Sequence, residues 1–429
     1  MNFLLSNKNF LFIFLGRIVT NIGDSIYYVA AMWLVYELGG SAFYTGLAGF
    51  LILLPKALQF LIGPLIDRWQ VRKILIRTQL LQCFILLIIP VSYFFDVLTV
   101  QLILIIMPMV AIIEQFSYPT QNKILPLILK KEDLLKGNTY FSFAYQGIDL
   151  IFNAIAGILV TLIGAITLFV IDSVTFAICA LLFSLIKLSN QNQKTNIIQN
   201  DIDKTVFYRT YLNELTEGLK IVFKNLLPML IGAMLINFAI GITYSILPSL
   251  AMEKGGPHIY GYYLTGISTG SLIGALLASK FGEFKVGKIF IYGFLLATCC
   301  WGFSAIIPNT LIAIILFGLA WIPIGCVNII LGTVCQVIIP NELLGRVTSA
   351  TYSLGAVSLP FGSLIGGYLA TIINVELVFA FTAVGSLLIT LVWLIHPKLR
   401  NLPKVNEINS QLFNIESIGE ENQVRQTNF

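Results

Sequence analysis

Long apolar runs separated by short polar turns make up most of this chain. Twelve runs are apparent, near residues 10–36, 43–66, 74–95, 98–119, 138–162, 165–187, 226–250, 260–281, 288–307, 310–336, 347–371 and 375–396. Each run provides about 20 residues or more, the length that an α-helix needs to cross a bilayer. The pattern therefore predicts an all-α membrane protein with twelve transmembrane helices.

The longest interior break, about residues 188–225, divides the runs into six plus six. It begins with the polar stretch SNQNQKTN and ends with apolar residues at helical spacing, which predicts an amphipathic helix on the membrane surface. An Asn-, Glu- and Gln-rich stretch follows the last run and predicts disorder. The expected order is an N-terminal six-helix half (1–187), a cytoplasmic linker (188–225), a C-terminal six-helix half (226–396) and a disordered cytoplasmic tail (397–429).

Composition supports the membrane assignment. Of the 429 residues, 57% are hydrophobic and 11% are charged, and the mean hydropathy is +0.87. Soluble domains carry about 25% charged residues. The basic residues lie in short turns between apolar runs, which argues for contact with the lipid bilayer and against a nucleic-acid partner. All six cysteines lie inside apolar runs without zinc-site spacing, so we expect no metal site and no cofactor.

Lysine and arginine are distributed unevenly between the two sets of turns. The turns after the second, fourth, sixth, eighth and tenth runs are rich in them, whereas the opposite set holds one, Lys254. Because basic residues accumulate in cytoplasmic loops, both termini are predicted to be cytoplasmic. The chain is expected to be a multi-pass protein of the plasma (inner) membrane.

The two predicted halves repeat weakly. Residues 63–73 (GPLIDRWQVRK) align with 278–288 (ASKFGEFKVGK), and 131–140 align with 340–349. Internal duplication of six spans is typical of transporters, whose substrate site lies between the halves near the bilayer midplane. The stretch GEFKVGK resembles a phosphate-binding loop, but Ile289 follows it where Ser or Thr is required. An ion gradient is therefore the expected energy source.

Charged residues inside the predicted spans are candidates for function, because each costs about 2.5–3.5 kcal/mol at the bilayer centre. The ones placed deep in a span all lie in the N-terminal half, namely Arg17, Asp24, Lys56, Asp149 and Asp172, with Glu114 nearer the cytoplasmic end. Asp172 is predicted to be structural, because its run is expected to pack on the outside of the bundle. Glu114, near the cytoplasmic end of its run, is either a gate residue or a solvated acid.

The first run carries polar residues on one helical face. Arg17, Asn21, Asp24 and Tyr28 are spaced by four, three and four residues, so they share a face that is expected to line a cavity. Asp24 lies near mid-span, where loss of water favours the protonated carboxyl group. It is therefore a candidate for proton coupling, with a structural pair to Lys56 or Arg17 as the alternative. Arg17 could instead extend toward the membrane edge.

A second polar face is predicted in the fifth run, where Tyr145, Asp149 and Asn153 recur every four residues. Asp149 is a candidate second proton site or a contact for a cationic substrate. Lys56 follows Pro55 in the second run and is expected to contact substrate or to pair with an acid.

The C-terminal half offers neutral cavity candidates instead of charges. They are amide and aromatic residues, namely Asn237, Tyr244, Trp321 and Asn328. Such a wall suits a bulky apolar ligand with few fixed polar contacts. Ordinary packing is the alternative role for each of them.

Four stretches resemble the major facilitator superfamily, most closely its branch of macrolide and siderophore (enterobactin) exporters. They are the turn at 63–73, GRIVTNIGD at 16–24, and the stretches at 116–138 and 338–347. The resemblance implies two pseudo-symmetric six-helix halves and alternating access. It also implies a cytoplasmic gate, formed by Gly63, Asp67, Arg68, Arg72 and Lys73, with Glu114 beside it.

The favoured hypothesis is a proton-coupled exporter of amphipathic small molecules, of macrolide, drug or siderophore type. A proton- or sodium-coupled importer of a small solute is the alternative, and a non-transporting membrane sensor is less favoured. An enzyme is not expected, because the carboxylates are scattered rather than clustered. A monomer is expected, since the site would lie within one chain.

Overall fold

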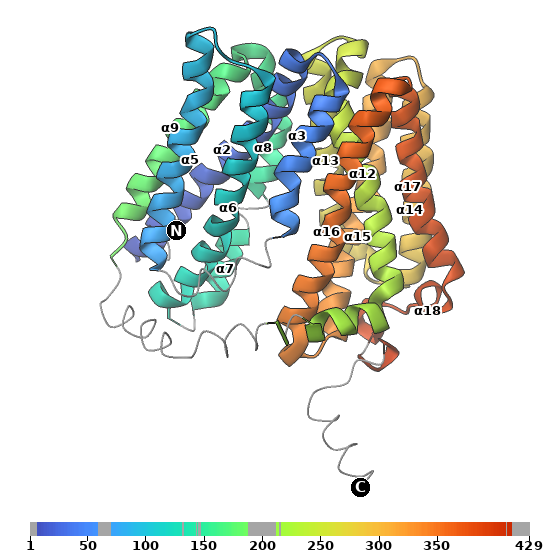
Figure 1. Ribbon diagram of the computed structural model, residues 1–429. Helices are drawn as coiled ribbons and strands as arrows, with labels where there is room; N and C mark the ends of the chain where they lie inside the picture. The colour runs from blue at the N-terminus through green and yellow to red at the C-terminus, as the bar shows by residue number, and fades with distance from the viewer. Residues whose placement is uncertain are drawn as a thin grey trace. The chain divides into compact units, whose positions relative to one another are not determined.

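The computed structural model describes residues 7–58, 70–130, 133–142, 144, 147–187, 212–213, 216–408 and 410–413, and what it describes is helical apart from short connections. The helices of the first half are α2 (Lys8–Gly39), α3 (Ala42–Ala57), α5 (Val71–Phe94), α6 (Val100–Ile128), α7 (Leu134–Ser142), α8 (Ile148–Ile163) and α9 (Ala165–Ser184) (Figure 1). The later part holds the π-helical turn η5 (Val222–Leu226), then α12 (Leu227–Lys254), α13 (Pro257–Phe281), α14 (Val286–Ile306), α15 (Thr310–Ile338), α16 (Asn341–Ile372), α17 (Val375–Ile395) and α18 (Pro397–Arg400), and finally the 3₁₀ turns η6 (Val405–Glu407) and η7 (Ser410–Phe413).

These helices match the predicted apolar runs. Ten helices in the described part of the chain are long and apolar enough to cross a membrane, and α3 is a shorter apolar helix. The remaining run, 138–162, contains the end of α7 and all of α8 except its last residue. The twelve-helix prediction is confirmed, with part of the second run outside the described residues.

Local sequence explains how consecutive helices reverse direction. The Asn7 side chain accepts a hydrogen bond from the Phe10 backbone N–H at 3.1 Å and so caps the start of α2. The helix ends at Gly40, whose φ of +62° is a left-handed conformation that glycine adopts without strain. Ser41 then caps α3 through the Phe43 N–H at 3.2 Å, so two residues connect two long helices.

The chain forms two compact units. The first contains residues 1–204 together with 245–265, and the second contains 205–244 and 266–429. In the first unit, α2 packs against α8 and α9, and α5 packs against α6 and α9. In the second, α14 packs against α15 and α17. These units follow packing, whereas the predicted halves follow chain order, and the predicted boundaries stay a prediction.

Two segments outside the predicted halves are ordered in the second unit. The end of the predicted linker runs from Thr216 into α12 as one helix, and the Arg346 guanidinium pairs with the Glu217 carboxylate at 2.6 Å. After α17, the Val286 N–H donates to the Pro403 carbonyl at 3.0 Å, and Phe413 is buried. The prediction of disorder after residue 396 is therefore wrong for the described part of that tail, because its apolar side chains pack on the unit.

Candidate functional site

The predicted polar face of α2 lies inside the first unit. Arg17 is 2% exposed, and its Nη1 donates a hydrogen bond to Gln121 Oε1 at 2.7 Å. Its guanidinium also lies over the Phe141 ring, 5.7 Å from the centroid, where the ring face attracts a cation. The Asn21 side-chain amide donates to the Ala144 carbonyl at 2.7 Å. Arg17 therefore does not extend to the membrane edge, because its charge is held among buried partners.

A chain of buried polar side chains extends from Arg17 across three helices. The Gln121 amide donates to Ser117 Oγ at 3.1 Å on α6, and the Gln79 amide of α5 lies 3.4 Å from the same oxygen. The Thr20 hydroxyl of α2 lies 3.3 Å from Gln79 Oε1, which closes the connection. Sequence reasoning missed these residues, although the pairs Gln79–Gln82 and Ser117–Gln121 show helical spacing.

A separate face of α2 carries small residues against α9. An added Cβ at Gly16 would lie 2.3 Å from the Phe183 ring, and one at Gly23 would lie 2.2 Å from Asp172 Oδ1. The Thr20 hydroxyl, between them, lies 3.1 Å from Cys179 Sγ. Close approach of the two helices thus depends on the absence of side chains at these glycines.

Asp172 is fully buried at this α2–α9 contact. The Thr175 hydroxyl lies 2.7 Å from the Asp172 carbonyl oxygen and 3.2 Å from its Oδ1. The Asp172 carboxyl also interacts electrostatically with Tyr27, as do Asp24 and Glu114. Three acids from α2, α6 and α9 therefore act on one buried hydroxyl, and the structural role predicted for Asp172 stays a prediction.

Asp24, Tyr28 and Lys56 occupy less buried positions in the same unit. Asp24 and Tyr28 are half-buried and Lys56 is exposed. The Lys56 charge acts on the Tyr28 hydroxyl, which brings α2 and α3 into electrostatic contact. Asp24 acts on Tyr27 and Cys179. The predicted face of α2 thus divides into a buried part at Arg17 and Asn21 and a more open part beyond Asp24.

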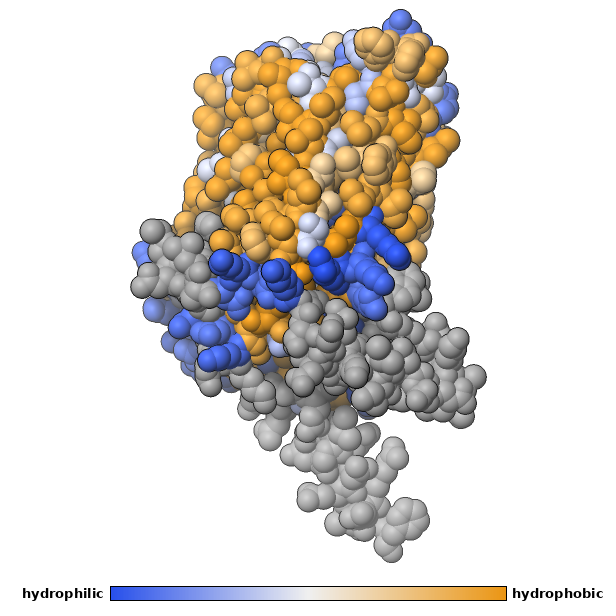
Figure 2. All heavy atoms as spheres, turned by 90° about the vertical axis from the view of Figure 1, so that its left-hand side faces the viewer, coloured by the Kyte–Doolittle hydropathy of each residue, from blue (hydrophilic) through white to orange (hydrophobic). Residues whose placement is uncertain are grey.

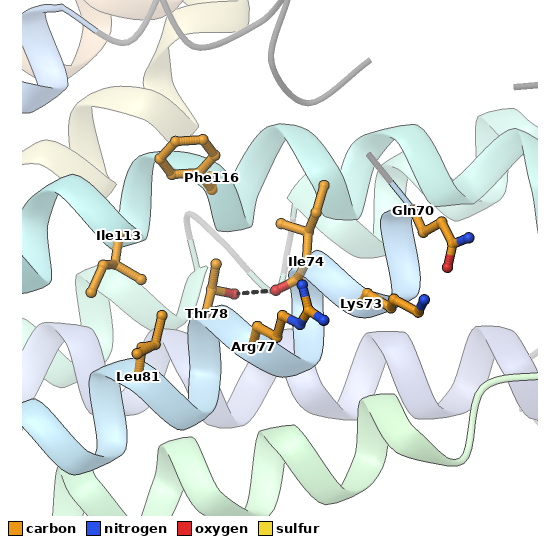
Figure 3. Close-up of a pocket in the computed structure, with 8 residues that line it drawn as sticks. All are labelled: Gln70, Lys73, Ile74, Arg77, Thr78, Leu81, Ile113 and Phe116. Atoms are coloured by element: carbon orange, nitrogen blue, oxygen red, sulfur yellow. Dashed lines mark hydrogen bonds between the residues drawn. The ribbon is translucent and has the colours of Figure 1, made fainter. Parts of the chain in front are cut away.

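The gate and α8 candidates are only partly described. Arg72 donates a hydrogen bond from Nη2 to the Ser184 carbonyl, which ties α5 to α9. Lys73 is exposed and lines a groove on the other side, between α5 and α6 (Figure 3). Glu114 is half-buried. Four of the remaining candidates lie outside the described residues, namely Gly63, Asp67, Arg68 and Tyr145. For Asp149 and Asn153 the structure describes the helical backbone but not the side chain.

In the second unit, the neutral candidates separate into two sets. The Tyr244 and Trp321 rings lie 6.3 Å apart, and Trp321 is 6% exposed. The Asn237 amide donates to the Gly355 carbonyl at 3.1 Å and so ties α12 to α16. Asn328, in contrast, is exposed on α15. The structure therefore brings Tyr244 and Trp321 together and leaves Asn328 apart from them.

The end of α12 and the start of α13, residues 245–265, pack on other helices of the first unit. The Thr45 hydroxyl of α3 donates to the Ser245 carbonyl at 2.6 Å, and the Trp33 ring of α2 stacks on Tyr260 at 6.0 Å. At α8, an added Cβ on Gly157 would lie 2.1 Å from Gly261 Cα. We call this contact of residues 245–265 with α2, α3 and α8 the hairpin seam.

Three comparisons with known proteins agree. A family model described as "Transmembrane secretion effector" matches residues 4–427. Macrolide efflux protein A of Streptococcus pyogenes is 24% identical over 92% of this chain and 95% of its own. The staphyloferrin A transporter of Staphylococcus aureus is 22% identical over 87% and 92%.

A solved structure supports the fold. The bacterial homologue of the human lysosomal transporter Spinster, in an inward-facing and unoccupied conformation, covers 90% of this chain and 96% of its own. Its TM-score is 0.64 at 15% identity. With buried charges in an all-helical, multi-span fold and a family match along nearly its whole length, this chain belongs to the transmembrane secretion effectors of the major facilitator superfamily, and it is a membrane transporter rather than an enzyme.

Proposed function

We propose that this protein is a proton-coupled exporter of amphipathic small molecules, of macrolide, drug or siderophore type. It works as a monomer in the plasma membrane with both termini in the cytoplasm. Relatives named for macrolide efflux and for a siderophore support the substrate class. The uneven distribution of lysine and arginine between the turns supports the orientation.

The observation that carries the proposal is the polar interior of the first unit. Arg17 is 2% exposed and bonds to Gln121, and three acids act on Tyr27 nearby. Buried charge at membrane depth costs several kcal/mol and is rarely present without a function. A transporter that exchanges protons for substrate needs such groups, because a carboxylate must gain and lose its proton away from water.

Asp24 is the proposed proton carrier, with Asp149 as a second one. Asp24 lies between the buried part of α2 at Asn21 and the open part at Tyr28. When Asp24 holds a proton it is neutral, and its attraction for a cationic or polar group of the substrate is lost. Proton binding and substrate binding then oppose each other, which is the requirement for exchange of one for the other.

The second unit holds the proposed apolar contact for the substrate. Tyr244 and Trp321 form an aromatic pair, and the candidates on this side carry no charge. An amphipathic substrate would place its apolar surface against this pair. Specificity of this kind depends on area and shape, so related apolar compounds should compete with one another.

The hairpin seam is the proposed moving contact. Its elements are a hydrogen bond at Thr45, a ring stack at Trp33 and a glycine contact at Gly157. Each of these three contacts is apolar or a neutral hydrogen bond. Such a contact can open and close at low cost, as alternating access requires.

The test is substrate transport in proteoliposomes with an imposed pH gradient. Wild type is compared with Asp24→Asn, and Glu37→Gln serves as a control because Glu37 is exposed on the same helix. Macrolides, lipophilic cations and siderophores are the substrates. We expect transport out of the compartment that corresponds to the cytoplasm, driven by the gradient, in wild type and the control. We expect it to be lost in Asp24→Asn.

Other outcomes would favour other functions. Movement in the opposite direction under the same gradient would indicate an importer. Movement that follows sodium and ignores pH would indicate sodium coupling. Binding of a ligand without movement of any solute would indicate a sensor.

A further inference from the structure

We propose that the groove between α5 and α6 is a binding site for an anionic phospholipid. The groove has a volume of about 530 Å³ and is lined by Gln70, Lys73, Ile74, Arg77, Thr78, Leu81, Ile113 and Phe116. Its volume falls within the range of about 300–1,000 Å³ that is usual for small-molecule sites. It belongs entirely to the first unit, and Lys73 is the one lining residue that the resemblance also assigns to the cytoplasmic gate.

The groove is polar at one end and apolar at the other. Gln70, Lys73 and Arg77 recur at helical spacing from the start of α5, and Leu81 continues the same stripe. Figure 3 shows the cations toward one end of the groove and Leu81 facing Ile113 toward the other. This is the arrangement of a phospholipid, with a charged headgroup at the water boundary and acyl chains in the membrane.

The cations have no other partner in the described part of the chain. Lys73 and Arg77 are exposed, and neither has an ion pair or a side-chain hydrogen bond among the residues that the structure describes. The Thr78 hydroxyl is not a competing ligand, since it donates to the backbone of its own helix, 2.9 Å from the Ile74 carbonyl. Among its described lining residues, the groove therefore presents positive charge and no acid.

Arg77 also lies at a depth where it needs an anion. At 1.5 Å per residue, the 24 residues of α5 span about 36 Å, compared with about 30 Å of hydrocarbon. If the helix extends evenly on both sides, the Arg77 Cα lies about 6 Å inside the hydrocarbon boundary. A lipid phosphate at that boundary is within reach of its long side chain, which reduces the cost of the charge.

The apolar end continues into a surface that faces lipid. Beyond Leu81, the exposed residue Phe84 follows on α5, and Met109 and Ile105 follow Ile113 on the antiparallel α6. Figure 2 shows the corresponding side of the molecule with a broad apolar band above a hydrophilic belt. An acyl chain could therefore leave the groove along α5 and α6 without meeting a polar group. On the proposed orientation, the start of α5 faces the cytoplasmic leaflet, where anionic lipids concentrate.

The test is lipid binding by the purified full-length protein, measured by native mass spectrometry. The probes are phosphatidylglycerol and phosphatidylcholine with identical acyl chains. Wild type is compared with the double variant Lys73→Gln/Arg77→Gln. A matched control, Lys285→Gln/Lys288→Gln, removes two exposed lysines at the start of α14, the site that aligns with the start of α5 in the sequence repeat.

We expect wild type and the control to prefer phosphatidylglycerol by about tenfold or more, and the groove variant to lose this preference. A second variant, Leu81→Ala/Ile113→Ala, keeps both cations and should also bind phosphatidylglycerol more weakly. Inorganic phosphate at equal concentration should not displace the lipid. Equal affinity for both lipids in wild type, an equal loss in the control, or displacement by phosphate would overturn the proposal. Transport is not measured, so the result does not depend on the proposed function.

Discussion

Gly23 of α2 and Asp172 of α9 are in such close contact that an added Cβ at position 23 would lie 2.2 Å from Asp172 Oδ1. The same Cβ would lie 2.3 Å from Thr175 Oγ1. The Asp172 carboxyl is fully buried, so it has no open space into which it can move. The position of the acid is therefore set by a missing side chain one residue before Asp24.

Gly23→Ala should destabilise the first unit. Overpacking a close contact costs about 1–3 kcal/mol, and here the displaced group is a buried carboxyl rather than a flexible apolar chain end. Thermal unfolding in detergent should show a lower midpoint than that of wild type. Gly302→Ala is the matched control, because an added Cβ at Gly302 meets nothing within 4 Å. Equal midpoints for the two variants would contradict the α2–α9 contact.

The spans were predictable because their signal is local. A run of about 20 apolar residues has few alternatives in a chain with a mean hydropathy of +0.87. The spacing of Arg17, Asn21 and Asp24 also fixed a shared helical face. It could not fix which neighbour that face meets, because Gln121, the partner of Arg17, is 104 residues away.

The expected place of a segment does not give the place of each of its residues. Asp172 lies on a helix expected to pack on the outside of the bundle, yet its side chain is fully buried, because such a helix still turns one face inward. The tail after residue 396 was assigned as disordered from its overall polarity, yet Leu402, Ile408 and Phe413 within it are buried. Composition averages over a segment, whereas a few apolar residues at the right spacing are enough to anchor it.

Arg17 and Gln121 should show a strong energetic coupling. Their hydrogen bond is 2.7 Å long and buried, and bonds to charged groups contribute about 1.5–3 kcal/mol. A double-mutant cycle with Arg17→Ala, Gln121→Ala and the double variant should give a coupling of that size in unfolding experiments. The pair Arg17 and Gln115 is the control, because the Gln115 amide bonds to its own helix at the Ala111 carbonyl. Additive effects for Arg17 and Gln121 would mean that the bond is absent.

Phe413→Ala should destabilise the second unit although it lies beyond the last span. Phe413 is 4% exposed, and its carbonyl accepts a hydrogen bond from the Asn225 side chain at 2.6 Å. Truncation of a buried Phe costs about 3–5 kcal/mol. Thermal unfolding and expression level are the measurements. Leu394→Ala, at a residue 43% exposed near the end of α17, is the control and should have a smaller effect.

Gly157→Ala should open the hairpin seam. The added Cβ would lie 2.1 Å from Gly261 Cα, which is backbone and cannot move aside as a flexible side chain would. If overpacking disfavours the closed seam by about 1–3 kcal/mol, the open population rises about 5- to 150-fold.

Ser249, 4% exposed near the end of α12, reports on this opening. With the six native cysteines replaced, Ser249→Cys should react faster with a membrane-impermeant thiol reagent when Gly157→Ala is present. Gly355→Ala is the control, because the nearest atom to its added Cβ is 3.7 Å away, an ordinary contact.

An unchanged reaction rate in Gly157→Ala would show that the seam stays closed or that the glycine contact does not hold it. The seam could not then be the moving contact of alternating access. A faster rate together with slower transport would instead identify the glycine pair as a part of the transport cycle.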